Sequence, residues 1–202
     1  DAVQGFLKLP LKLRNSGIDL LSASGHKVYA PKGVGLLYLK KGVRLAPLLY
    51  GGGQQNGVRV GTDSVALIAG FAAAAREHAG KMAEHLEHYQ QLRDHLADLV
   101  KPLPQVQFNS GEGCAPFVVN LSLDRMRSEV MLHFLERYGI FVSSGSACSK
   151  GAKSHVLGAM GLPASRVDTA LRLSFSPETT EEDLDYFVKI CGLGIDSLAK
   201  LK

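Results

Sequence analysis

The stretch DSVALIAGFAAAAREHAGKMAEHLEHYQQLRDHLADLV, residues 63–100, decides how the chain folds, because nearly every residue in it favours an α-helix. Asp63 or Ser64 can cap its start, apolar residues recur at helical spacing, and two prolines follow its end. Gly80 is a point where the helix could bend or break. A long helix at a change of composition often joins two domains, so we place a domain boundary here.

The segments on either side of this helix predict an α/β fold. Before it, two apolar runs are typical of strands, and a glycine-rich loop separates them from the helix. After it, the pattern is strand, amphipathic helix, short strand, loop, strand and capped final helix. We expect strands before the helix at 18–24 and 33–41. After the helix, we expect strands at 117–123, at the start of the run from 140 and at 169–177. The expected amphipathic helix is 128–139.

The composition excludes several classes of protein. Of the 202 residues 46% are apolar and 21% charged, which is typical of a globular chain. No apolar run is long enough to span a membrane, and no secretory signal is visible. Lys and Arg are scattered at a net charge of +4, so we expect no nucleic-acid binding. Three widely spaced cysteines argue against a disulfide framework and indicate a reducing, cytoplasmic location.

One of the three cysteines lies in an unusual setting, the stretch SSGSACSK at residues 143–150. Small flexible residues surround Cys148, and Lys150, Lys153 and His155 follow it. Nearby positive charge favours the thiolate, so Cys148 is a candidate nucleophile. The alternative is an inert cysteine among small residues, since free cysteine is more often buried than reactive.

A second candidate is the lysine of SASGHK, residues 22–27, where a strand ends in a turn. Ser24 and His26 offer hydrogen-bond donors, and Gly25 allows a ligand to approach the backbone. A desolvated Lys27 could act as a nucleophilic amine or a base. The alternative is an exposed lysine after a strand, which is the commoner case.

Other polar residues carry weaker signals. The loop GGGQQNGVRVGT, residues 51–62, could wrap phosphate, but it matches neither nucleotide-binding glycine motif and could be a surface loop. Arg172 lies in an apolar strand, so it either grips a carboxylate or points to solvent. His78, His85 and His88 share a helix face, for which we expect solvent exposure. No residue completes a metal site with them, and we expect no bound metal.

The order of these motifs along the chain resembles the cysteine desulfurases of the NifS/IscS type, pyridoxal-phosphate enzymes of the class V aminotransferase family. The motifs are DAVQ at the start, SGHK with APKG, the glycine-rich loop, SSGSAC and LRLSFS. The resemblance covers essentially the whole chain, and the pairing of SGHK with SSGSAC is its most specific part.

The resemblance implies a role for each matching residue. Lys27 would hold pyridoxal 5'-phosphate as a Schiff base, and Cys148 would accept sulfur. The other implied contacts are Asp1 at the ring nitrogen, Gln4 at the ring oxygen, Ser24 and His26 at the phosphate, Thr62 at the phosphate of the neighbouring subunit of a homodimer, and Arg172 at the substrate carboxylate.

The implied reaction converts L-cysteine to L-alanine and leaves a persulfide on Cys148. The sulfur would pass to an acceptor protein, either an iron–sulfur scaffold or a tRNA-thiolation enzyme. Two alternatives remain open. One is a non-catalytic sulfur carrier that keeps the Cys148 loop. The other is a hydrolase that pairs Cys148 with His155 or His26, which leaves Lys27 and Arg172 without roles.

The sequence departs from the family pattern in two small ways and one large way. APKG replaces the usual Gly-Pro-Lys-Gly, and Gln54–Asn56 replaces a charged triplet. Family members also carry roughly another half chain before DAVQ. We therefore expect the C-terminal portion of a fold-type I transferase: part of the large α/β domain (1–62), a linking helix (63–104) and an α+β small domain with the cysteine loop (105–202). We expect this portion alone to lack a complete cofactor site.

Overall fold

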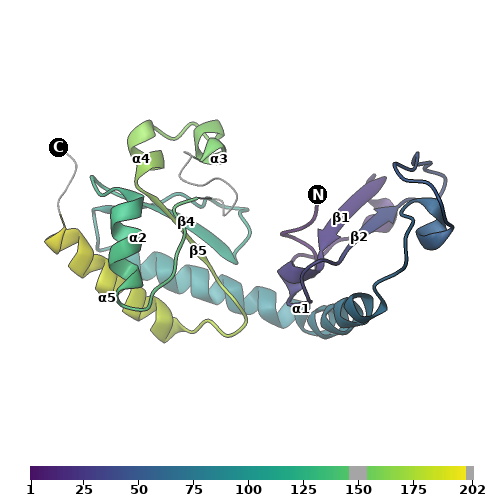
Figure 1. Cartoon of the computed structure of the whole chain (residues 1–202). Helices are drawn as coiled ribbons and strands as arrows, with labels where there is room; N and C mark the ends of the chain where they lie inside the picture. Colours follow the sequence, from purple (N-terminus) through teal and green to yellow (C-terminus); the bar gives the residue numbers. More distant parts are fainter. Residues whose placement is uncertain (146–153, 199–202) are drawn as a thin grey trace. The chain divides into compact units, whose positions relative to one another are not determined.

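The computed structural model describes residues 1–145 and 154–198 of the chain (Figure 1). The chain divides into two compact units, Asp1–His85 and Leu86–Lys202, which are described here one at a time. The helix α1 (Val65–Val100) belongs to both and continues through Gly80 without a break. The expected long helix is therefore confirmed, while the bend or break considered at Gly80 does not occur.

The first unit contains a two-stranded antiparallel sheet. Strands β1 (Leu20–Ser24) and β2 (Gly35–Leu39) confirm the two expected strands with shorter bounds, and they pair from Leu20 with Leu39 to Ser24 with Gly35. Gly35 is required by this pairing, because a Cβ there would lie 2.7 Å from the Ala23 carbonyl oxygen. The unit also has three short 3-10 helices: η1 (Leu13–Asn15), η2 (Gly25–Val28) and η3 (Gln54–Gly57).

A small core holds this unit together. Val28, Ala30 and Phe71 are buried, and the Phe71 ring meets the Phe6 ring edge-on at a centroid distance of 6.1 Å. Several large apolar side chains outside this core are exposed, above all Leu48 at 93% and Tyr50 at 81%. The unit therefore buries few of its apolar side chains within itself.

The second unit contains a three-stranded antiparallel sheet in the order β3-β4-β5. Its strands are β3 (Val106–Phe108), β4 (Val118–Leu123) and β5 (Ala170–Ser174). The expected strands at 117–123 and 169–177 are confirmed with shorter bounds, whereas β3 was not expected. Within residues 140–145, the described part of the run from 140, no strand forms, and Ser143 pairs with β5 through an isolated bridge to Arg172.

The two faces of this sheet differ, because successive side chains of a strand point to opposite sides. One face carries residues that are 5% exposed or less: Val119, Leu121, Leu123, Leu171 and Leu173. The paired residues of the other face include Asn120 with Arg172 and Ser122 with Ala170. The sheet thus has an apolar face that builds the core and a polar face.

Helices flank the sheet on both sides (Figure 1). α2 (Ser128–Glu136) and α5 (Glu181–Ser197) pack together, where Gly194 leaves room for Met131 and Phe134. The short helices α3 (His155–Ala159) and α4 (Ala164–Asp168) lie on the opposite side from α5. The Ser122 hydroxyl on the polar face donates to the Arg166 carbonyl in α4 at 2.7 Å.

Two helix ends follow the expected signals. Thr180 and Asp183 form a reciprocal capping box at the start of α5, with both hydrogen bonds present. α2 ends at Glu136, and Gly139 follows with a φ of +76°, a backbone conformation that favours glycine. None of the helices described in residues 1–145 and 154–198 combines the length and apolar character needed to cross a bilayer.

The histidines of α1 correct one expectation, since they do more than cover a solvated face. The His78 ring stacks on Tyr29 at 5.0 Å, and the His88 ring bonds the Thr179 carbonyl at 2.9 Å. His95 contacts the Asp185 carboxylate at 2.9 Å. Segments distant in the sequence therefore supply partners that a helical pattern alone cannot reveal.

Candidate functional site

The turn at the end of β1 presents Lys27. The 3-10 helix η2 begins at Gly25, whose N–H donates to the Val34 carbonyl at 2.9 Å. The N–H of Ala30 returns to the Gly25 carbonyl at 3.1 Å, and Tyr29 adopts a left-handed φ of +62°. These bonds close the turn, so the half-buried Lys27 side chain extends from a fixed backbone.

Packing explains why glycine occupies position 25. The residue is buried, and a Cβ there would lie 3.0 Å from a Val34 methyl carbon and 3.2 Å from the Ala30 Cβ. A larger residue would push the turn away from the start of β2. The position of Lys27 therefore depends on the absence of a side chain at Gly25.

Two polar side chains meet beside this turn. The Ser24 hydroxyl and the His26 Nδ1 are 2.8 Å apart, Ser24 half-buried and His26 exposed. This bond fixes the hydroxyl and the ring relative to each other. The structure thus brings together two of the residues predicted to contact phosphate.

A second lysine lies near Lys27. Burial lowers the pKa of Lys8, and the positive charge of Lys27 lowers it further. Two ammonium groups of like charge therefore share one neighbourhood, which favours an anion there. Sequence reasoning missed Lys8, because it lies in an irregular segment far from Lys27 along the chain.

The first residues of the chain lie against β1. The N–H of Ala2 donates to the Ser22 carbonyl at 2.8 Å, and Val3 N–H donates to the Asp1 carboxylate at 2.7 Å. A turn from Ala2 to Phe6 follows, in which Gln4 is exposed. Asp1 and Gln4 thus belong to a segment anchored to the strand that leads to Lys27.

The glycine-rich loop folds on itself. The Gln55 amide donates to the Asp63 carboxylate at 3.1 Å, and Gly61 N–H donates to the Gln54 side chain at 3.3 Å. Thr62 is exposed, and no described hydrogen bond joins it to the turn at Lys27. The structure therefore does not bring Thr62 together with the other predicted residues of its unit.

In the second unit, Arg172 is half-buried on the polar face of the sheet. Its Nη2 donates to the Ser143 hydroxyl at 3.4 Å, and its Nε is buried without a hydrogen-bond partner. Among the described residues the guanidinium thus contacts a hydroxyl and no carboxylate, so the carboxylate-binding role of Arg172 stays a prediction. Sequence reasoning missed the contact with Ser143, although it lies in the quoted cysteine stretch.

The cysteines divide by environment. Cys148 lies outside the described residues, so its surroundings stay a prediction, as does a pairing with His155 at the start of α3. Cys114 is exposed and Cys191 is buried, and both are free thiols. Burial raises the pKa of the Cys191 thiol to about 12, which makes it a poor nucleophile at neutral pH.

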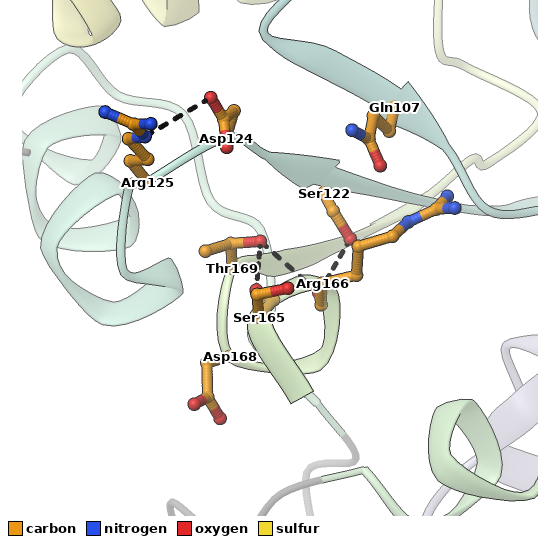
Figure 2. A pocket seen from close by; sticks show the side chains of 8 residues that line it. All are labelled: Gln107, Ser122, Asp124, Arg125, Ser165, Arg166, Asp168 and Thr169. Carbon is orange, nitrogen blue, oxygen red and sulfur yellow. Dashed lines mark hydrogen bonds and ion pairs between the residues drawn. The ribbon is translucent and has the colours of Figure 1, made fainter. Parts of the chain in front are cut away.

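A cavity of about 410 Å³ also lies in the second unit, between the polar face and α4 (Figure 2). Its lining mixes both charges with hydroxyls and one amide, and consists of Gln107, Ser122, Asp124, Arg125, Ser165, Arg166, Asp168 and Thr169. No predicted site residue is among them.

Within residues 1–145 and 154–198, no group of three His, Cys, Asp or Glu side chains is placed to hold a metal ion.

Comparison with known proteins shows the family. The Aminotransferase class-V model matches residues 1–187, so the chain belongs to that family. A cysteine desulfurase of Nostoc sp. is 40% identical over 194 residues, which are 94% of this chain and 48% of that protein. One from Rhodobacter capsulatus is 42% identical over 193 residues, 94% of this chain and 50% of the relative.

A solved structure gives the same result for the fold. This chain superimposes on the solved structure of a NifS-like protein with a TM-score of 0.88 and 34% sequence identity. The match covers 98% of this chain and 52% of the NifS-like protein. The resemblance and the α/β fold class expected from the sequence are both confirmed. The chain spans about half the length of the curated relatives it matches.

Proposed function

We propose that this chain supplies the cofactor lysine, the carboxylate-binding arginine and the sulfur-accepting cysteine of a pyridoxal-phosphate-dependent cysteine desulfurase. Membership of the class V aminotransferase family supports the reaction class. The observation that carries the proposal is the turn at Lys27, where a buried glycine and a hydroxyl–imidazole pair lie next to the lysine in the sequence.

The chemistry of this turn fits pyridoxal phosphate. An aldehyde needs an amine, which Lys27 offers, and a phosphate dianion needs donors and positive charge. Ser24 and His26 supply the donors at 2.8 Å from each other, and Lys8 adds charge. When bound, the cofactor supplies an electron sink for charge at the substrate α-carbon. Asp1 would keep the ring nitrogen protonated and Gln4 would bond the ring oxygen.

The protein residues then divide the work. Arg172 would bind the carboxylate of L-cysteine, because a half-buried guanidinium that forms no described ion pair matches a carboxylate. Lys27 would move a proton from the substrate α-carbon. The Cys148 thiolate attacks the substrate sulfur, so a sulfur–sulfur bond forms and the carbon–sulfur bond breaks. The carbon takes up a proton and leaves as L-alanine, and Cys148 keeps the persulfide.

The proposal extends to partners. The persulfide would pass to an acceptor protein of iron–sulfur assembly or tRNA thiolation in the cytoplasm. Thr62 would reach the cofactor phosphate of a second subunit in a homodimer, which agrees with its exposure and its lack of described contacts with Lys27. A homodimer would also cover some of the exposed apolar side chains of residues 48–50.

Trapping the cofactor tests the proposal. The natural polypeptide that contains this chain is mixed with pyridoxal phosphate, reduced with borohydride and digested for mass spectrometry. We expect a visible absorption band and a phosphopyridoxyl group on Lys27. Lys27→Arg should abolish both, whereas Lys32→Arg, a change at an exposed lysine of the same loop, should leave both intact.

The same sample separates the enzyme from a carrier. Release of sulfide and alanine from L-cysteine, lost in Cys148→Ala, would support the desulfurase. Label on other lysines in proportion to their exposure would contradict the assignment of Lys27. If Cys148 accepts sulfur from a donor persulfide while no cofactor binds, the chain is a sulfur carrier and the proposal is wrong.

A further inference from the structure

Ser143 and Arg172 form a tightly joined pair at the outer edge of the second sheet. Arg172 N–H donates to the Ser143 carbonyl at 2.6 Å, and Ser143 N–H donates to the Arg172 carbonyl at 3.1 Å. They form an isolated bridge on β5, opposite its pairing with β4. The main chain at Ser143 is therefore fixed by the residue whose guanidinium lies next to it.

The side chains repeat this link. The Arg172 Nη2 donates to the Ser143 hydroxyl at 3.4 Å, while the Nε is buried and unpartnered. In the described part of the chain, no carboxylate forms an ion pair with this guanidinium. A half-buried guanidinium with unused donors is a site for an external anion, and a carboxylate is the ligand that matches its planar fork.

Asn120, which pairs with Arg172 from the neighbouring strand, does not provide the contact to the guanidinium that Ser143 provides. Asn120 pairs with Arg172 in the register of β4 and β5, so their side chains share a face. The Asn120 side-chain oxygen already accepts a hydrogen bond of 2.7 Å from the Asn109 amide. Ser143 is thus the described side chain that holds the guanidinium from its side of the strand.

We propose that Ser143 is a positioning residue for substrate recognition, which orients the Arg172 guanidinium toward the carboxylate of the incoming amino acid. This inference rests on the proposed desulfurase function. Ser143 lies five residues before Cys148 in the sequence. It therefore contacts the proposed carboxylate-binding arginine and also begins the segment that contains the cysteine. A guanidinium held in place loses less rotational freedom when it binds, which raises affinity for carboxylate ligands.

The test uses the natural polypeptide that contains this chain, loaded with its cofactor. Ser143→Ala removes the hydroxyl but keeps the backbone bridge, and Ser143→Thr keeps both. Ser174→Ala is the matched control, because this exposed serine lies two residues after Arg172 and has no described side-chain bond. We expect Ser143→Ala to raise KM for L-cysteine about three- to tenfold with kcat little changed, since one hydrogen bond is lost.

Two further measurements separate positioning from a general loss of structure. The inhibition constant of L-alanine should rise with KM in Ser143→Ala, whereas that of cysteamine, which lacks the carboxylate, should not change. In an Arg172→Lys background, Ser143→Ala should have no further effect, because the two residues act as one unit. Ser143→Thr should restore the wild-type values, and Ser174→Ala should never depart from them.

Each remaining outcome overturns a defined claim. If the wild-type protein turns over L-cysteine but Ser143→Ala leaves KM unchanged, or raises the constants for L-alanine and cysteamine equally, the role of Ser143 is wrong and the desulfurase stands. If the two substitutions have fully additive effects, the coupling to Arg172 is wrong. If the wild-type protein neither turns over L-cysteine nor binds L-alanine, the proposed function fails together with this inference.

Discussion

The two units of the chain use their apolar residues in opposite ways. The second unit buries both strands and helices around one sheet face, with Leu92, Leu96, Leu121 and Leu171 fully buried. The first unit pairs two strands over a small core and leaves Leu48 93% exposed. Since two strands alone are rarely stable in water, the stability of the chain should reside mainly in the second unit. The unit that carries Lys27 is thus the less self-sufficient one.

The largest expected effect tests this contrast with one core substitution in each unit. Leu121→Ala should lower the free energy of unfolding by about 3 kcal/mol, because it opens a cavity at a fully buried position. Val28→Ala in the first unit removes less buried volume and should cost about 1.5 kcal/mol. Urea unfolding followed by circular dichroism measures both. A larger loss from Val28→Ala would reverse the assignment of stability.

Two glycines of α5, Gly192 and Gly194, test how tightly the core of the second unit is packed. A Cβ at Gly194 would lie 2.7 Å from the Met131 terminal carbon and 3.0 Å from the Phe134 ring, whereas a Cβ at Gly192 meets nothing within 4 Å. Gly194→Ala should therefore destabilise by about 2 kcal/mol through overpacking. Gly192→Ala should stabilise by about 0.5 kcal/mol, because alanine favours the helix. Thermal unfolding of the two variants should shift in opposite directions.

The pH dependence gives an intermediate effect. Burial raises the pKa of Cys191 to about 12, so the folded state keeps this thiol neutral at pH values where an unfolded thiol ionises. The stability gained from the neutral thiol is fully present at neutral pH and is lost as the pH rises above about 8.5, at up to about 1.4 kcal/mol per pH unit. Unfolding between pH 8 and 10 should show a steeper loss in the wild type than in Cys191→Ala. Equal slopes would mean that Cys191 ionises alike in both states.

The smallest expected effect concerns the cap of α5. Thr180→Ala removes the hydroxyl that accepts the Asp183 N–H at 3.3 Å and should cost about 1 kcal/mol. Thr180→Ser keeps the hydroxyl and serves as the control. Chemical denaturation resolves the difference, and an unchanged midpoint in Thr180→Ala would show that the start of α5 needs no cap.

The elements predicted from sequence are those with long, regular patterns. α1, β1, β2, β4, β5 and α5 each carry a periodic apolar pattern or a capping signal, which depends on neighbouring residues alone. β3 has three residues, VQF, and gains its identity only by pairing with β4. In residues 140–145, where a strand was expected to start, a single bridge forms for the same reason, since pairing there depends on β5.

The candidate site follows the same division. Ser24, Gly25, His26 and Lys27 are adjacent in sequence, so the motif alone predicted that they share a turn. Ser143 and Arg172 are 29 residues apart, and their contact depends on how the chain returns to the sheet edge. The local motif therefore predicted which residues lie beside Lys27, whereas the contact between Ser143 and Arg172 could be seen only in the three-dimensional structure.

The two-faced sheet of the second unit has a consequence for evolution and engineering. Substitutions at Asn120, Ser122 or Arg172 can change chemistry on one face without touching the side chains that hold the other face together. Losing a single residue from β5 would exchange the faces, placing Arg172 in the core and a leucine on the polar side. Deleting two residues would keep the alternation. Deletions of an even number of residues in this strand should therefore be tolerated better than deletions of an odd number.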